Sequence, residues 1–319
     1  MEEKIKKGCI CCLGVLGVLL LAVLGAVLYF GPNDDIYLLP PSPEQYAKSA
    51  LNKMNSALYI DENWSQEKEK ALKEVKSAKT YADTYPILKK MTKLSGGKHS
   101  YFYTPKEFKT SQKEESQLPV IKNENGILYL KLPPFMGNEK EAKAYQTILN
   151  RALTKETYKG VIVDLENNSG GNMYPMIGGL AAILPNDTLF QFEYANGQKI
   201  GTTLSQILAS KQTEENSNSS SKTIPIAILV NGNTASSGEM TTLAFKGLPN
   251  VKIFGKPTAG YTTGNMVYSL YDGATIQLTV SRIIDRKGNR YENTPIEPDI
   301  ATTTPLNDAR TWLQEQISK

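Results

Sequence analysis

The stretch IPIAILVNGNTASSGEM, residues 224–240, joins an apolar run to a turn of small and polar residues. The run 224–230 predicts a buried strand, because continuous aliphatic residues are typical of strands covered on both faces. A helical pattern follows, so Ser236 and Ser237 fall at a strand-to-helix turn. Such a turn exposes a hydroxyl, and the amides at the helix start can stabilise an oxyanion. The turn therefore predicts a nucleophilic serine, with helix capping as the alternative role.

Strands and helices alternate on both sides of this turn. Residues 126–132 and 160–165 predict strands, and the segment 138–154 between them predicts a helix. A strand, a helix and a second strand in this order favour parallel pairing, so the sequence predicts an α/β fold. Further strands are expected at 99–103, 251–255 and 275–280, and further helices at 174–183, 237–247 and 306–318.

The N-terminal residues differ from the rest of the chain. An uncharged run from Gly8 to Phe30 follows three lysines and precedes two aspartates. Its 23 residues, rising about 1.5 Å each in a helix, would cross a hydrocarbon core of about 30 Å. We therefore predict a transmembrane anchor at 1–30, with the N-terminus in the cytoplasm and the rest of the chain outside the cell membrane. A cleaved secretory signal is the alternative, and it exports the same part of the chain.

Four further segments are predicted after the anchor. Residues 31–41 form a linker, and Ser42 begins a small helical bundle at 42–95 with a capping-box pattern. The remainder, 96–319, is the α/β core. Within it, 185–223 begins with a short hairpin pattern around Asn196-Gly197 and ends in a polar tract, which is typical of an inserted cap or flap.

Composition limits the chemistry. The net charge of +4, from 36 basic and 32 acidic residues, is too small to indicate a nucleic-acid partner. The three cysteines lie at 9, 11 and 12, inside or beside the predicted anchor, and the chain has one histidine. The exported part therefore offers no thiolate or histidine cluster for a metal, and we expect neither metal nor cofactor. The oligomeric state is left open.

Two other segments carry candidate catalytic groups. The single histidine, His99, follows two glycines and opens a predicted strand, and it is the natural base for a serine nucleophile. The segment DLENNSGG, 164–171, ends a strand with a polar turn. Gly170 and Gly171 let backbone amides approach a developing negative charge. A structural histidine and an ordinary turn are the alternatives.

Four motifs in order resemble the core of the C-terminal processing (tail-specific) peptidases. They are DLENNSGG (164–171), VNGNTASSGE (230–239), GKPTAGYTTGN (255–265) and YENTPIEPDI (291–300). The resemblance covers about residues 97–305. It implies a crotonase-like β/α spiral core, with Ser236 as the nucleophile. It also implies that the amides of Ser237 and of the Gly170-Gly171 pair hold the oxyanion.

The chain departs from the family pattern in two places. Many members have a lysine base after the Pro-Thr-x-Gly turn, where this chain has Tyr261. Members of the tricorn-core branch use a histidine near the start of the catalytic part, and His99 fits that pattern. Many members also carry a PDZ domain, for which residues 96–125 are too few. Glu292, Asp299 and Glu239 are candidates for orienting His99, and Glu292 ranks first.

The sequence therefore predicts a membrane-anchored serine peptidase that cuts a peptide near its C-terminal end. A non-catalytic protein that sequesters its peptide, or a general tail-specific protease, is the alternative. The residues expected to bind the substrate flank the two glycine-containing turns: Asn172, Met173, Tyr174, Tyr261, Thr262 and Asn265.

Overall fold

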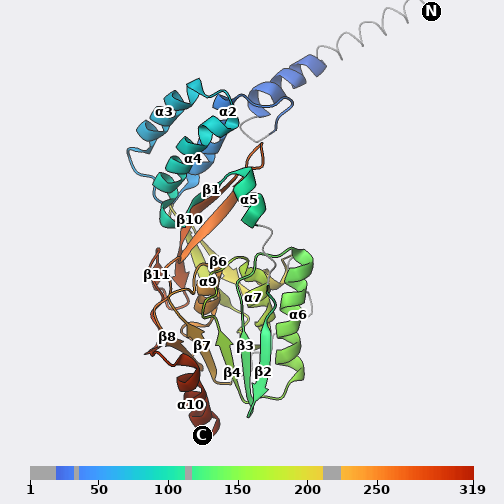
Figure 1. The fold of residues 1–319 in the computed structure, drawn as a ribbon, viewed down its shortest axis with the longest axis vertical. Coiled ribbons are helices and arrows are strands. Elements are labelled where there is room, and N and C mark those ends of the chain that lie inside the picture. Colours follow the sequence, from blue (N-terminus) through green and yellow to red (C-terminus); the bar gives the residue numbers. More distant parts are fainter. Residues whose placement is uncertain (1–18, 32–35, 112–116, 211–223) are drawn as a thin grey trace, which may run out of the picture. The chain divides into compact units, whose positions relative to one another are not determined.

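The computed structural model describes residues 19–31, 36–111, 117–210 and 224–319. It contains two compact units. The first comprises Met1–Phe108 and Val267–Leu278, and the second comprises Lys109–Met266 and Thr279–Lys319. The helices of the first unit and the helices and sheet of the second are drawn in Figure 1.

Three helices build the first unit: α2 (Pro43–Lys53), α3 (Trp64–Glu74) and α4 (Tyr81–Gly96). The capping box predicted at Ser42 is confirmed, because Ser42 Oγ accepts from the Gln45 amide and Gln45 Oε1 accepts from the Ser42 amide. One-turn helices, η2 (Met54–Ser56), η3 (Val75–Ser77) and η4 (Gly97–His99), follow the three helices. Strand β1 (Tyr101–Tyr103) and helix α5 (Pro105–Ser111) come next.

Part of a hairpin from late in the chain, Val267–Leu278, belongs to the first unit. Strands β9 (Thr263–Ser269) and β10 (Thr275–Asp285) form this hairpin, and β1 pairs antiparallel with the start of β10. Asp272, in the turn, accepts hydrogen bonds from the Tyr46 hydroxyl at 2.9 Å and the Tyr85 hydroxyl at 2.5 Å. Burial, followed by the nearby Asp272 carboxylate, raises the pKa of Tyr46 far above its ordinary value. The sequence analysis did not predict that this segment joins the helices.

The second unit is built on a six-stranded sheet with the order β12-β8-β7-β4-β3-β2. Strands β3 (Ile127–Lys131), β4 (Gly160–Asp164), β7 (Ile226–Val230), β8 (Val251–Gly255) and β12 (Ile300–Ala301) run parallel. Strand β2 (Val120–Glu124) pairs antiparallel with β3. The predicted parallel pairing across the helix α6 (Glu139–Lys155) is confirmed, because Ile127 lies opposite Gly160.

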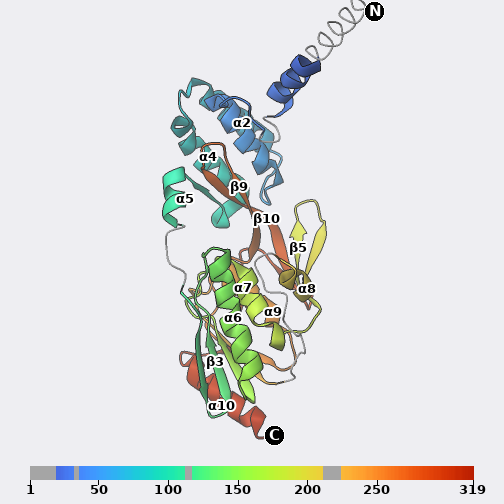
Figure 2. The same cartoon turned by 90° about the vertical axis from the view of Figure 1, so that its right-hand side faces the viewer.

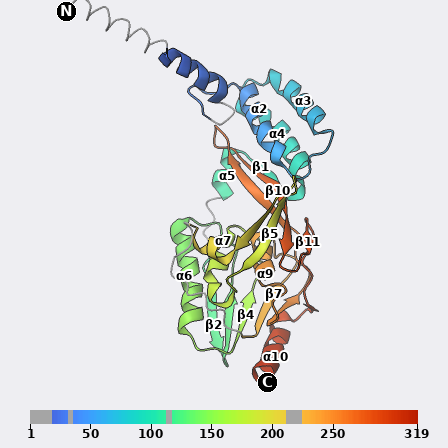
Figure 3. The same cartoon turned by 180° about the vertical axis from the view of Figure 1, so that it is seen from behind.

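Alternation along the strands divides the core of this unit between the two faces of the sheet. Leu128, Val161 and Ile228 belong to a cluster that includes side chains of α6, α7 (Met173–Gly179) and α9 (Ser237–Phe245). Ile162 and Leu229 belong to a second cluster with side chains of α10 (Pro305–Ile317). Figure 2 shows α6, α7 and α9 gathered together, and Figure 3 shows the same sheet from behind. Both faces are buried, which explains the continuous apolar strands.

The predicted hairpin around Asn196-Gly197 is present. Strands β5 (Thr188–Tyr194) and β6 (Lys199–Thr203) pair antiparallel, and α8 (Leu204–Leu208) follows. Strand β5 also pairs with residues 281–285 of β10, and β11 (Arg290–Tyr291) pairs with β10 as well. The rest of the predicted insertion, residues 211–223, lies outside the described residues.

Part of the predicted anchor also lies outside the described residues. Residues 19–30 are helical, and residues 1–18 are not described. Among the helices that are described, none combines the length and the apolar character needed to span a bilayer.

Asp272→Ala should destabilise the first unit, because it leaves the Tyr46 and Tyr85 hydroxyls without their acceptor. Hydrogen bonds to charged groups contribute about 1.5–3 kcal/mol each, so we expect a loss of about 3–6 kcal/mol. Urea unfolding followed by Trp64 fluorescence in a Trp312→Phe background would measure it, since Trp64 lies on α3. Glu69→Ala, which removes an exposed ion pair with Lys73, is the control and should leave the midpoint unchanged. Equal midpoints for both variants would contradict the role of Asp272.

Candidate active site

Ser236 lies in a strained backbone conformation at the turn between β7 and α9. Its φ is 51° and its ψ is −117°, in the left-handed half of the map that non-glycine residues rarely occupy. Such a residue costs about 1–3 kcal/mol and persists only where surrounding contacts fix it. Ser236 is the N-cap of α9 and is partly exposed. The turn therefore presents its side chain at the positive end of a helix.

The Glu239 carboxylate is the main contact that fixes this turn. It is fully buried and accepts from the Ser236 amide at 2.8 Å. It also accepts from the Thr258 hydroxyl at 2.5 Å and from the amides of Gly260 at 2.8 Å and Tyr261 at 2.7 Å. Burial raises the pKa of Glu239, and these hydrogen bonds oppose the rise. One carboxylate thus ties the serine turn to the 258–261 turn.

The two glycines of the 164–171 loop lie against the serine turn. A Cβ atom at Gly170 would come within 2.8 Å of Ser236 Cβ and 3.1 Å of the Ser237 amide nitrogen. Gly170 has a φ of 109°, which an L side chain rarely adopts. The Ser237 hydroxyl donates to the Gly171 carbonyl at 2.5 Å. Only a glycine therefore fits beside Ser236 at position 170.

The backbone amides of Gly171 and Ser237 belong to the same two residues that this hydroxyl–carbonyl hydrogen bond joins. Other backbone groups of the loop are hydrogen-bonded. The Phe135 amide donates to the Gly170 carbonyl, and the Asn172 amide donates to the Phe135 carbonyl. Within the described residues, no group accepts a hydrogen bond from the Gly171 or Ser237 amide. Two such donors, one at the start of α9 and one in the glycine loop, can stabilise an oxyanion.

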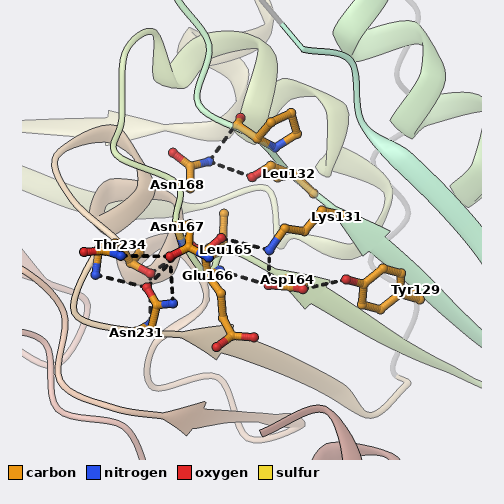
Figure 4. A network of polar contacts seen from close by, with 12 residues as sticks. Tyr129, Lys131, Leu132, Asp164, Leu165, Glu166, Asn167, Asn168, Asn231 and Thr234 are labelled. Carbon is orange, nitrogen blue, oxygen red and sulfur yellow. Dashed lines mark hydrogen bonds and ion pairs between the residues drawn. The ribbon is translucent and has the colours of Figure 1, made fainter.

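Asparagine side chains join the two loops (Figure 4). The backbone amide of Asn167, whose φ is 60°, donates to Asn231 Oδ1 at 3.0 Å. In return, Asn231 Nδ2 donates to Asn167 Oδ1 at 3.2 Å. Asn233 Nδ2 donates to the same Asn167 oxygen at 2.9 Å. Asn168 is fully buried, accepts from the Gly170 amide and donates to the Leu132 carbonyl. These bonds fix the spacing between the glycine loop and the serine turn.

A partly buried ion pair supports the start of the glycine loop. Asp164, at the end of β4, accepts from Lys131 Nζ at 2.9 Å and from the Tyr129 hydroxyl at 2.5 Å. Lys131 also donates to the Glu166 carbonyl at 2.8 Å. Because these side chains come from adjacent parallel strands, the ends of β3 and β4 hold the loop (Figure 4).

The 291–300 segment packs on the opposite side of the 258–262 turn. Thr262 Oγ1 donates to the Thr294 carbonyl at 2.8 Å, and the Ile296 amide donates to Thr258 Oγ1 at 2.8 Å. A Cβ atom at Gly260 would come within 2.9 Å of the Pro295 nitrogen. All four sequence motifs therefore meet within the second unit.

Residues 126–302 match the family described as Peptidase family S41. The chain belongs to this family. It is 39% identical to the "Nisin-resistance protein" of Lactococcus lactis subsp. lactis over 299 residues, which cover 92% of this chain and 94% of that protein. The "Carboxy-terminal processing protease CtpA" of Bacillus subtilis (strain 168) is 28% identical over 155 residues, 48% of this chain and 31% of that protein.

Solved structures agree with the family assignment. The structure of a lipoprotein from Streptococcus agalactiae superimposes with a TM-score of 0.80 at 41% identity, covering 88% of this chain and 99% of that one. The photosystem II D1 C-terminal processing protease superimposes with a TM-score of 0.59 at 16% identity, covering 86% and 98%. The second likeness shows the fold alone. Together with the family match, these findings support a serine-type S41 peptidase.

His99, the predicted base of this S41 peptidase, belongs to the first unit. It ends η4, directly after α4, and its carbonyl accepts from Gln277 Nε2 at 3.3 Å. Its side chain is buried, which lowers its pKa to about 4, with smaller contributions from Lys98 and Lys93. The imidazole is therefore neutral at physiological pH, as a general base requires.

The three carboxylates considered for orienting His99 have other partners. Glu292 pairs with Arg282 through a short contact. Asp299 accepts from the Ile253 amide at 2.8 Å and so fixes the sheet edge. Glu239 serves the serine turn, as described above. The first-ranked candidate, Glu292, thus has a charged partner that the sequence analysis did not consider.

The predicted substrate-binding residues lie on and just after the two turns: Met173 and Tyr174 begin α7, Asn265 belongs to β9, and Tyr261 and Thr262 lie in the turn before β9. Asn172 caps α7 and accepts from the Tyr174 amide at 3.0 Å, whereas Met173 and Tyr174 pack partly against the core. Thr262 is buried, and Asn265 accepts from the Thr279 hydroxyl at 2.9 Å.

The sequence analysis missed the joining residues Asn167, Asn231 and Thr258. The sequence signal for these three residues was weak. Each is a short polar residue in a turn that follows a strand, a position where such side chains commonly bond the backbone.

Gly170→Ala should reduce peptidase activity by about 100-fold or more, because displacing reacting groups by about 1 Å has an effect of that size. The added methyl would meet Ser236 Cβ at 2.8 Å. Peptide hydrolysis, measured as kcat/KM, tests this. Gly126→Ala is the matched control, since Gly126 also has a positive φ of 76° but nothing lies within 4 Å of the added atom. Full activity of a folded Gly170→Ala protein would show that the glycine does not confine the nucleophile.

Proposed function

We propose that this protein is a membrane-anchored serine peptidase that cleaves nisin near its C-terminal end outside the cell and so confers resistance. The observation that carries the proposal is the similarity to the nisin-resistance protein of Lactococcus lactis over nearly the whole of both chains. That similarity extends beyond residues 126–302, which match the family, into the helical first unit. The predicted anchor at 1–30 would export the catalytic part of the chain, so that it would act outside the membrane of a Gram-positive cell.

In the proposed mechanism, His99 removes the proton from Ser236 Oγ, and the oxygen attacks a peptide carbonyl near the substrate's C-terminus. The amides of Ser237 and Gly171 then hold the oxyanion. His99 returns the proton to the leaving amine, which leaves an acyl-enzyme on Ser236. Water, deprotonated by His99, hydrolyses this ester. Gly170 shapes the site and contributes no donor.

The neutral state of His99 and the strain at Ser236 support these roles. A histidine whose pKa is about 4 accepts a proton weakly in the ground state but is fully available at neutral pH. Glu292 would orient His99 only by sharing its carboxylate with Arg282, so we assign it no proton transfer.

Substrate binding is proposed on the two loops beside Ser236 and on the predicted cap. Nisin carries thioether rings, and a stiffened chain loses less entropy on binding than a linear one. Asn172, Met173 and Tyr174 would line one side and Tyr261 and Asn265 the other, whereas the buried Thr262 would support the turn rather than contact the substrate. The β5–β6 hairpin would be part of the predicted cap, 185–223.

Two alternatives predict different products. A sequestering protein would bind nisin without cutting it, and Tyr261 at the lysine position of many relatives favours it. A general tail-specific protease would cut unrelated linear peptides, and the 28% identity with the CtpA protease favours it.

Ser236→Ala and His99→Ala should each abolish cleavage while leaving nisin bound. The full chain in detergent would be incubated with nisin, and the products followed by mass spectrometry, with Ser65→Ala on the exposed face of α3 as the control. A C-terminal fragment from wild type and Ser65→Ala alone supports the proposal. Intact nisin in every sample, with wild type still binding it, would establish sequestration, and cleavage of unrelated linear peptides at the same rate would establish the general protease.

The pH dependence of kcat/KM should report His99. Protonation removes the base, so the acid limb should fall with a midpoint near pH 4 rather than near 6.5. Folding favours the neutral form, because the folded pKa lies below the unfolded value. The stability that His99 contributes is therefore complete above about pH 6.5 and is lost as the pH falls through about 4. A limb near pH 6.5 would mean that His99 is solvated in the active enzyme.

A further inference from the structure

An exposed apolar segment lies directly after the N-terminal run. Ile36, Leu38 and Leu39 are 56%, 50% and 67% exposed, and Tyr37 between them is partly buried. Four consecutive apolar residues in such a position are unusual on a water-facing surface. The segment needs a partner that covers apolar side chains.

The segment is held against the first unit and is not a free tail. The Tyr37 ring packs edge-on against Tyr271, with centroids 5.3 Å apart. The Tyr81 hydroxyl donates to the Pro41 carbonyl at 2.7 Å, and Pro41 is buried. The segment is therefore fixed at both ends, while the three aliphatic side chains stay exposed.

Tyr271, in the β9–β10 turn, extends the same surface. Tyr271 is 45% exposed, and its ring also packs edge-on against Tyr81 at 6.0 Å. Tyrosine is enriched where a protein crosses the boundary between lipid and water, because its ring is apolar and its hydroxyl is polar. Aliphatic side chains flanked by tyrosines are the composition of such a boundary.

The apolar run ends beside this surface. Residues 19–30 are helical and expose large apolar side chains, including Leu20, Val23 and Phe30. The Ile36 amide donates to the Gly31 carbonyl at 2.8 Å, so the segment begins next to the end of that helix. A run that crosses a bilayer ends in the headgroup layer, and residues within a few ångströms of its end lie there as well.

We propose that Ile36, Tyr37, Leu38, Leu39 and Tyr271 form an interfacial foot that inserts into the boundary between headgroups and acyl chains of a phospholipid bilayer. Amphipathic surfaces of this kind are buried about 5–10 Å into that boundary. The foot would hold the helices of the first unit at the membrane surface in one orientation. The proposal rests on the anchor at 1–30 and is independent of the proposed cleavage of nisin.

Tryptophan placed in the foot would report lipid contact. The full chain carrying Leu38→Trp would be reconstituted into phosphatidylcholine vesicles with and without chains brominated near the headgroup, and the quenching of wild type would be subtracted. Leu94→Trp is the matched control, because Leu94 is also an exposed leucine of the first unit, 49% exposed against 50% for Leu38. We expect Leu38→Trp to lose at least twice the fraction of fluorescence that Leu94→Trp loses.

The outcomes separate the foot from the anchor. Flotation of the full chain with vesicles, combined with equal quenching of both variants, would overturn the foot and leave the anchor standing. A blue-shifted but unquenched emission from the Leu38→Trp variant would mean that protein, such as a second copy of the chain, covers the surface, and it would also overturn the proposal. A chain that does not float with vesicles would overturn both, whatever nisin cleavage shows.

Discussion

One buried carboxylate, that of Glu239, joins the turn that carries Ser236 to the 258–261 turn. Glu239 sits in the first turn of α9 and accepts hydrogen bonds from both sides: from Ser236 on its own helix and from the 258–261 turn. A charged group in such a position is stable only when its oxygens are satisfied, and four donors satisfy them. Ser236 keeps its strained φ while its amide donates to this carboxylate.

The parallel sheet explains why the other loops reach the same place. Carboxyl ends of neighbouring parallel strands lie at one edge, so the loops after β3, β4, β7 and β8 are adjacent although the sequence separates them. Polar side chains then fix the loops to one another at specific distances. The Asn167–Asn231 pair and the Asp164–Lys131 pair do this at the ends of the strands that precede the serine and glycine turns. Both pairs are polar, so they can hold the loops in place at a partly exposed surface without hydrophobic contacts.

Much of the second unit was predictable from the sequence because its patterns are local. The apolar runs 126–132, 160–165 and 226–230 form strands with the predicted parallel order, and the glycine and serine motifs lie together as expected. Contacts that depend on distant residues were not predictable. Nothing local in Asp272 indicates that Tyr46 and Tyr85 will bind it, because those partners lie nearly two hundred residues or more away. The asparagine pair joining two loops escaped prediction for the same reason.

The presence of Tyr261 where many relatives have a lysine is consistent with this physical picture. Glu239 accepts a hydrogen bond from the Tyr261 backbone, which every residue except proline can supply. The turn beside Ser236 therefore does not depend on the side chain at 261, and a lysine can be lost there without loss of the serine's conformation. In the proposed mechanism the base comes from another part of the chain, and His99, the one histidine of the sequence, is kept neutral by burial. Because the Glu239 carboxylate bonds only the backbone of residue 261, the identity of the base could differ while the conformation of Ser236 is kept.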